Sequence, residues 1–173
     1  TCALPIYAPM IYLIGVMGMR PEEVYALQRG DLEFSDDGRE CRIHIRRARK
    51  EGKNGDGSKR VGIMEDDPTG KTKTRRSRRA LDVPPFLVPI LRRHLEEYVL
   101  PRPEAWIFTG ERTRDIVQPQ SIRNAWYEAR RSVPRLEEKK ARLYDLRHRA
   151  LTMMAGYTNN LKVVMAAGGH TQV

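Results

Sequence analysis

Apolar and polar residues alternate over one short stretch of this chain, and that stretch limits the fold more than any other feature. Cys41, Ile43 and Ile45 fall on one side of an extended backbone, and the basic residues between them fall on the other. An alternation of period two is typical of a half-buried β-strand. Because the segments before and after it carry apolar residues at helical spacing, the chain cannot be all-helical or all-β.

Two further strands complete a small sheet. Residues 50–59 contain the sequence NGDG, a composition that predicts a hairpin tip. Residues 61–65 and 76–83 have the composition of strands, and Pro84 ends the second of them because proline cannot donate a ladder hydrogen bond. We therefore expect three short antiparallel strands.

Helical periodicity covers most of the remaining chain. A core helix over 8–18 ends at Gly18, and Pro21 begins a second helix that we expect to end at Gly30, because proline favours the first turn of a helix and glycine its end. Further segments share this periodicity and occupy 85–99, 119–133 and two stretches after position 143. The sequence thus predicts an α+β fold that is mostly α-helical, with a small three-stranded antiparallel sheet inserted after the second helix.

The net charge of the chain limits the classes of partner that it is expected to bind. The 32 lysines and arginines outnumber 22 acidic residues, which gives a net charge of +10 and a pI near 9.9. Such an excess favours a polyanionic partner, with nucleic acid ahead of a membrane surface or an acidic protein. No apolar run is long enough to span a bilayer and no secretory leader is visible, so we expect a soluble, cytoplasmic protein with no membrane partner.

Metal-binding patterns are missing from the sequence. Cys2 and Cys41 have no metal-like spacing, and we expect Cys41 to be a reduced core residue. The four histidines show no metal-ligand spacing, and no HExxH motif occurs. We expect no metal site and no cofactor.

The densest positive charge lies in residues 71–79 (KTKTRRSRR), where six of nine residues are basic. A solvated strand edge would explain this run, but lysines and arginines also supply charge, and hydroxyls supply neutral donors, for the phosphate backbone of DNA. We predict DNA-backbone contacts from this run and from two arginines on predicted helices, namely Lys71, Arg75, Arg76, Arg78, Arg79, Arg123 and Arg149.

The stretch 143–149 (LYDLRHR) begins a helix, and the sequence GGH follows it at 168–170. Asp145 can accept a hydrogen bond from a free backbone N–H of the first helical turn. Tyr144 and Arg147 are neighbours on the helix surface because they are three positions apart. A buried guanidinium beside a helix start suits a planar anion such as phosphate, although this stretch alone fits a surface or ion-paired arginine better.

Four motifs in this order resemble the catalytic domain of tyrosine recombinases, the phage-integrase family, over about residues 8–173. Residues 18–24 (GMRPEEV) are similar to the family's first arginine box, and 73–79 (KTRRSRR) to the hairpin that carries its catalytic lysine. Residues 144–148 (YDLRH) match the second arginine box, and 161–170 match the segment that ends in a later histidine.

The resemblance implies a role for each motif. Arg20 and Arg147 would bind the non-bridging oxygens of the scissile phosphate and offset charge in the transition state, and Glu23 would support this site. Lys73 would protonate the leaving oxygen as general acid. His170 would hydrogen-bond the phosphate or assist proton transfer. The chemistry of the family needs neither metal nor nucleotide.

The resemblance also implies a tyrosine that attacks phosphorus and forms a 3′-phosphotyrosine intermediate. Tyr144 occupies a position that is often histidine in the family, so it is expected to line the site and not to be the nucleophile. The family's nucleophilic tyrosine follows the last histidine on a further helix, and no tyrosine here has that place. We therefore expect a chain truncated at its C-terminus that binds DNA without cleaving it.

Domain boundaries follow from the same resemblance. Residues 1–6 (TCALPI) match one reading frame of a common sequencing-library adaptor, and we expect them to be non-native. Residues 7–173 would form the catalytic domain, without the core-binding domain that usually precedes it.

The function implied is that of a site-specific DNA recombinase, an integrase of a phage or integrative element in a prokaryotic host. Its partners would be double-stranded DNA with an attachment-type site and further copies of itself, which form a tetrameric synapse in the family. A type IB topoisomerase-like enzyme and a non-catalytic DNA-binding or regulatory protein on the same fold are the alternatives. An RNA- or ribosome-associated module would leave the ordered motifs to coincidence.

Overall fold

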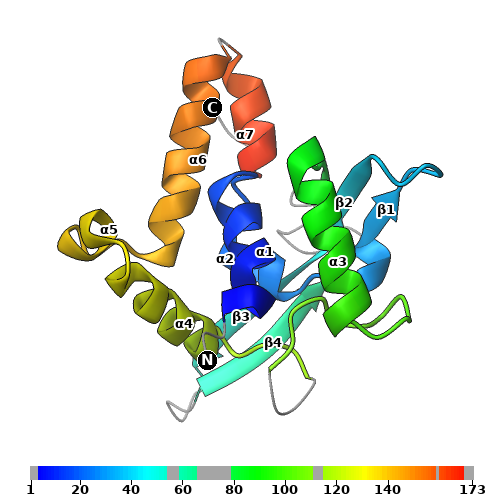
Figure 1. Cartoon of the computed structure of the whole chain (residues 1–173), viewed down its shortest axis with the longest axis horizontal. Coiled ribbons are helices and arrows are strands. Elements are labelled where there is room, and N and C mark those ends of the chain that lie inside the picture. Colours follow the sequence, from blue (N-terminus) through cyan, green and yellow to red (C-terminus); the bar gives the residue numbers. More distant parts are fainter. Residues whose placement is uncertain (1–3, 54–58, 66–78, 111–114, 159, 170–173) are drawn as a thin grey trace.

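A central helix organises the fold. The computed structural model describes residues 4–53, 59–65, 79–110, 115–158 and 160–169. Helix α1 (Leu4–Gly15) lies between α3 (Val88–Tyr98) and α6 (Leu143–Tyr157), and it contacts both as well as α4 (Pro119–Arg131) (Figure 1). Met10, Leu13 and Ile14 of α1 are fully buried. The apolar core therefore forms around α1.

The alternating stretch forms the middle strand of a three-stranded antiparallel sheet. Strand β2 (Cys41–Ile45) pairs with β1 (Leu32–Phe34) on one side and with β5 (Arg79–Asp82) on the other. Cys41, Ile43 and Ile45 are buried, as the period-two pattern predicts. The prediction of a mostly helical α+β fold with a small antiparallel sheet inserted between the second helix and α3 is confirmed.

The membership of that sheet differs from the prediction. Strand β4 (Lys59–Glu65) contains the predicted strand 61–65, but it pairs with β3 (Arg47–Lys53) in a separate two-stranded ribbon. The chain leaves the first sheet after Ile45, where Arg46 and Arg47 both donate to the buried carboxylate of Asp31. Strand β1 is the third strand of this sheet instead. Its three residues are too few to show an alternation of period two in the sequence.

The second helix is shorter than predicted. Helix α2 (Pro21–Tyr25) begins at proline as expected, but Gly30 does not end it and lies within the 3₁₀ turn η1 (Arg29–Asp31). The intervening backbone bonds to a distant segment, because Leu27 O accepts from Ile107 N at 3.0 Å and Arg29 N donates to Ala105 O at 2.8 Å. Tertiary pairing thus replaces the continuing helix.

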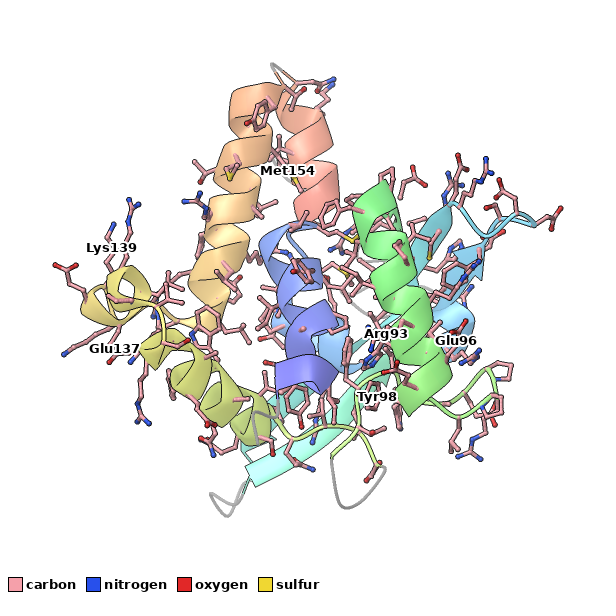
Figure 2. The ribbon with its side chains drawn as sticks, viewed as in Figure 1. Arg93, Glu96, Tyr98, Glu137, Lys139 and Met154 are labelled. Atoms are coloured by element: carbon pink, nitrogen blue, oxygen red, sulfur yellow. The ribbon has the colours of Figure 1, made fainter. Side chains whose placement is uncertain are left out.

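The remaining helices follow the predicted order. The 3₁₀ turn η2 (Pro85–Leu87) leads into α3, and a short helix α5 (Pro134–Glu138), which the sequence did not predict, joins α4 to α6. Helix α7 (Leu161–Gly168) packs beside α6 (Figure 1), and Met154 lies between the two helices (Figure 2). Among the described residues, no helix has both the length and the apolar character that crossing a membrane requires.

Helix α1 begins earlier than the predicted position 8 and ends at Gly15, before the predicted end at Gly18. Gly18 lies in the following turn with a φ of 66°, in the left-handed region that favours glycine. The helix includes Leu4 to Ile6, which are among the residues expected to be adaptor-derived. A helix can form whatever the origin of its residues, so the adaptor origin of residues 1–6 stays a prediction.

The central strand offers a test of the core. Ile43→Ala removes a side chain that is 0% exposed, and we expect it to lower the free energy of unfolding by about 2–5 kcal/mol because a cavity remains. Arg42→Ala is the matched control: Arg42 is exposed in the same strand and pairs with Asp82 at the surface, so its loss should cost under about 1 kcal/mol. Urea unfolding measures both, and equal losses would contradict the assignment of the buried face.

Candidate phosphate-binding site

Arg20 is held at the entrance of α2 by Glu23. Its backbone N–H donates to Glu23 Oε2 at 2.9 Å, and its guanidinium Nη1 donates to Glu23 Oε1 at 3.0 Å. The first of these bonds is a helix capping interaction, because the acidic residue at the third helical position satisfies the free N–H at the helix start. Pro21 fixes the first helical residue. The local sequence therefore positions Arg20, whose side chain remains 28% exposed.

Arg79 brings a second guanidinium to the same carboxylate. It is the first residue of β5, and its Nη1 and Nη2 donate to Glu23 Oε1 and Oε2 at 2.9 and 2.8 Å. This two-point geometry is the strongest form of an arginine–carboxylate pair. The Arg79 side chain is 11% exposed and that of Glu23 is 3% exposed. Glu23 therefore joins α2 to β5.

Arg147 is the third guanidinium, and backbone carbonyls hold it. Its Nη2 donates to Gly168 O at 2.6 Å, and its Nη1 donates to Gly18 O. Arg147 lies in the second turn of α6 and is 1% exposed. It therefore links the turn after α1 to the end of α7.

The end of α7 also contacts Arg20. Gly169 O accepts from Arg20 Nη2 at 3.0 Å. Gly169 has a φ of 63°, and a Cβ at this position would lie 2.6 Å from Arg20 Nη1 and 2.7 Å from Arg79 Nη1. Only glycine fits, because the backbone must both turn left-handed and approach two guanidinium groups.

The electrostatics of the cluster favour an anion. Burial tends to raise the pKa of Glu23, but hydrogen bonds and the charges of Arg79 and Arg20 outweigh it and hold the pKa below the ordinary value. Burial lowers the pKa of Arg147, and the nearby charge of Arg20 lowers it further. Arginine nonetheless stays protonated at neutral pH. Two guanidinium groups thus bond to one carboxylate and a third interacts with it electrostatically, and the excess positive charge favours a phosphate-like ligand.

The structure brings some predicted site residues together and does not describe others. Arg20, Glu23 and Arg147 lie in one cluster. Tyr144 lies one turn before Arg147 on α6, is 38% exposed, and its ring contacts that of His148 edge-on at 5.0 Å. Six predicted residues lie outside the described ranges, namely Lys71, Lys73, Arg75, Arg76, Arg78 and His170.

The other predicted residues make local contacts or are exposed. Asp145 accepts from the backbone N–H of Arg142 at 2.8 Å and caps α6 as expected. Arg123 lies on α4, where its Nη2 donates to Gln120 at 2.9 Å. Arg149 is exposed on α6. Arg123 and Arg149 remain candidates for DNA contact.

Arg79 has a partner that the sequence motifs did not indicate. The structure pairs it with Glu23 inside the cluster, and its predicted contact with the DNA backbone stays a prediction. The signal was present, because alternate residues of a strand share a face, and Arg79 stands two positions before the inward-facing Leu81. The parity of β5 therefore could have placed Arg79 inside.

Two further features lie apart from the cluster. A hollow of about 220 Å³ between α1 and α3 is lined by Ala8, Pro9, Ile90, Arg93, His94, Glu97 and Tyr98, and Figure 2 labels Arg93 and Tyr98 on α3. None of the clustered arginines lines it. Within the described ranges, no three His, Cys, Asp or Glu side chains lie close enough together to share a metal ion.

Comparison with known proteins adds independent support for the family resemblance. No protein-family model matches the chain. The integrase of Mycobacterium phage D29 is 27% identical over 167 residues, which covers 95% of this chain and 40% of that integrase. The integrase of Mycobacterium phage L5 is 28% identical over 170 residues, with the same coverage of both chains.

Solved structures share the fold. The Tn1549 transposon integrase in complex with a circular intermediate DNA has a TM-score of 0.73 at 17% identity, over 96% of this chain and 51% of that one. The XerH site-specific recombinase bound to difH substrate has a TM-score of 0.59 at 17% identity, over 97% of this chain and 40% of that one.

The chain is thus similar in sequence to phage integrases, and it shares the fold of the Tn1549 integrase and the XerH recombinase. The chain spans less than half the length of the curated phage integrases and about half of the Tn1549 integrase. The arginine–glutamate cluster forms from the same motifs that carry the family resemblance in the sequence.

The two carbonyl contacts of Arg147 lead to a stability prediction. Arg147→Lys replaces a fork of donors by a single ammonium, which cannot span Gly18 O and Gly168 O as the guanidinium does. We expect a loss of about 1–3 kcal/mol in the free energy of unfolding, because a buried carbonyl loses its donor. Arg149→Lys on the same helix is exposed and should change it by less than about 0.5 kcal/mol. Urea unfolding that shows the same small effect for both variants would refute the carbonyl contacts.

Glu23 should make the stability of the domain depend on acid pH. Its pKa is lower in the folded state than the ordinary value of 4.5, so its stabilising contribution is present above pH 4.5 and is lost as the pH falls through the folded pKa. Glu23→Gln should therefore be less stable at neutral pH and lose less stability below pH 4.5. Unfolding by urea across this pH range measures the slope.

The control for this slope is Glu138→Gln, which removes one carboxyl from an exposed position on α5. It should keep the wild-type pH slope. A wild-type slope in Glu23→Gln as well would show that Glu23 is not charged and paired in the folded domain.

Proposed function

We propose that this domain binds and orients the scissile phosphate of double-stranded DNA in a site-specific recombinase, an integrase that cleaves and rejoins strands through a 3′-phosphotyrosine intermediate. The observation that carries the proposal is the cluster of Arg20, Arg79 and Arg147 around the single carboxylate of Glu23. A cluster with two excess positive charges suits a phosphodiester, whose own charge increases as the attacking oxygen approaches.

The two motif arginines would have different tasks. Arg20 is partly exposed, and its guanidinium would donate to a non-bridging oxygen of the phosphate. Arg147 is buried, and it would supply positive charge at short range while it holds the glycine turns in place. Fixed donors of this kind stabilise the transition state without having to reorganise during the reaction.

The remaining roles rest on the family motifs. Lys73 would protonate the leaving 5′-oxygen, and His170 would hydrogen-bond the phosphate or assist proton transfer. Tyr144 would line the site, since a phenol can donate a hydrogen bond to a phosphate oxygen. The attack on phosphorus would come from the tyrosine that follows the last histidine in the family.

The similarity of this fold to that of proteins solved with DNA supports DNA as the partner. The Tn1549 integrase was solved with circular intermediate DNA and XerH with difH substrate. By analogy, the substrate of this domain would be a duplex with an attachment-type site, bound by several copies of the protein. The net charge of +10 suits such a polyanionic partner.

A binding experiment tests the proposal. The affinity of the chain for a short fluorescein-labelled duplex should fall linearly on a log–log plot against salt, because bound phosphates release counterions. Arg20→Ala should weaken binding about tenfold or more, since a hydrogen bond to a charged group contributes about 1.5–3 kcal/mol. Fluorescence anisotropy measures both effects.

Arg39→Ala is the control because it removes the same charge from the turn between β1 and β2, where the side chain is 86% exposed. It should change the affinity by less than about threefold. An affinity that does not depend on salt, or an equal loss in the two variants, would overturn the assignment of the cluster as the phosphate site.

A further inference from the structure

Arg79 has a place in the cluster that none of the sequence motifs assigns to it. Both oxygens of Glu23 accept from its fork, at 2.9 and 2.8 Å. Arg20 shares only one of these oxygens through its side chain, at 3.0 Å, and reaches the other through its backbone N–H. The two-point ion pair therefore belongs to Arg79, although Arg20 is only three positions from Glu23 in the sequence.

This division of contacts determines what Arg20 can still bind. Arg20 Nη2 is directed away from Glu23 and donates to Gly169 O at 3.0 Å. A buried carboxylate requires compensation for its lost hydration, and Arg79 supplies most of it. The charge of Arg20 is therefore only partly offset, and its side chain stays 28% exposed to an incoming anion.

We propose that Arg79 is a positioning residue, which holds Glu23 in a two-point pair and so prevents Glu23 from capturing Arg20 in the same way. Without Arg79, the carboxylate would have Arg20 as its nearest guanidinium partner, and a two-point pair between them would neutralise Arg20 and draw it from the phosphate. This inference rests on the proposed function, because it assigns Arg20 to the phosphate.

The geometry favours this role over a direct contact between Arg79 and DNA. The Arg79 side chain is 11% exposed, against 28% for Arg20, and its Nη1 and Nη2 both point to Glu23. The pairing of Arg79 with Ile45 in the sheet register also fixes its backbone. Arg79 thus has the less exposed of the two guanidinium groups that bond to Glu23.

A double-mutant cycle separates the two roles. Arg79→Ala should weaken binding of the labelled duplex about tenfold, and adding Glu23→Gln should restore it to within about threefold of wild type, since residues in contact couple by factors of roughly two to a hundred. Glutamine can still accept from the Arg20 backbone but carries no charge. The salt slope should fall by about one phosphate contact in the single variant and recover in the double variant.

Arg79→Lys is the control for a folding defect, because it retains the buried charge but cannot form a two-point pair with Glu23. It should unfold in urea cooperatively and show an intermediate loss of affinity. A double variant as weak as Arg79→Ala, with the same reduced salt slope, would instead make Arg79 a direct phosphate ligand and overturn the proposal.

Crystal structures of the same variants provide a readout that does not depend on DNA. In Arg79→Ala, both Glu23 oxygens should bond to the Arg20 guanidinium; an Arg20 that keeps its single side-chain bond would refute the inference. If the wild-type chain does not bind the duplex, the proposed function fails, whereas the Glu23–Arg20 rearrangement is still decided by these structures.

Discussion

Burying guanidinium groups beside a single carboxylate is the constraint on which the rest of this domain depends. Each buried charge loses its hydration, and the loss is tolerated only where a partner of good geometry replaces the water. Glu23 provides that partner for Arg79 and in part for Arg20, while Arg147 obtains backbone carbonyls instead. The cluster therefore has a surplus of positive charge but few unsatisfied donors, which prepares it for an anionic ligand.

Secondary structure delivers each of these groups by an ordinary mechanism. The capping interaction at the start of α2 fixes Arg20 and Glu23 relative to each other, and sheet pairing places Arg79 opposite Ile45. Helix α6 packs against α1 and carries Arg147 to the turn that contains Gly18. The small sheet and the helices around α1 thus hold side chains from segments far apart in sequence.

Local patterns in the sequence were sufficient for much of this picture. The alternation around Ile43 predicted the central strand, and proline at the start of α2 predicted the helix entrance that holds Arg20. Long-range backbone pairing was not predictable in this way: the bond from Ile107 N to Leu27 O ends the helical region early, and β4 pairs outside the main sheet. The inward position of Arg79 was available from strand parity, but the six basic residues of its run concealed it.

The carbonyl contacts of Arg147 also set the order in which the site can be completed. Arg147 bonds to Gly18 O across 129 positions of sequence and to Gly168 O across 21. During synthesis the N-terminal partner is therefore made long before Arg147, and the second carbonyl emerges after it. Gly169 O also bonds to Arg20, so the end of α7 contacts both arginines. Local unfolding of α7 would therefore break one contact of each arginine, while the packing of α1 against α3, α4 and α6 does not involve α7.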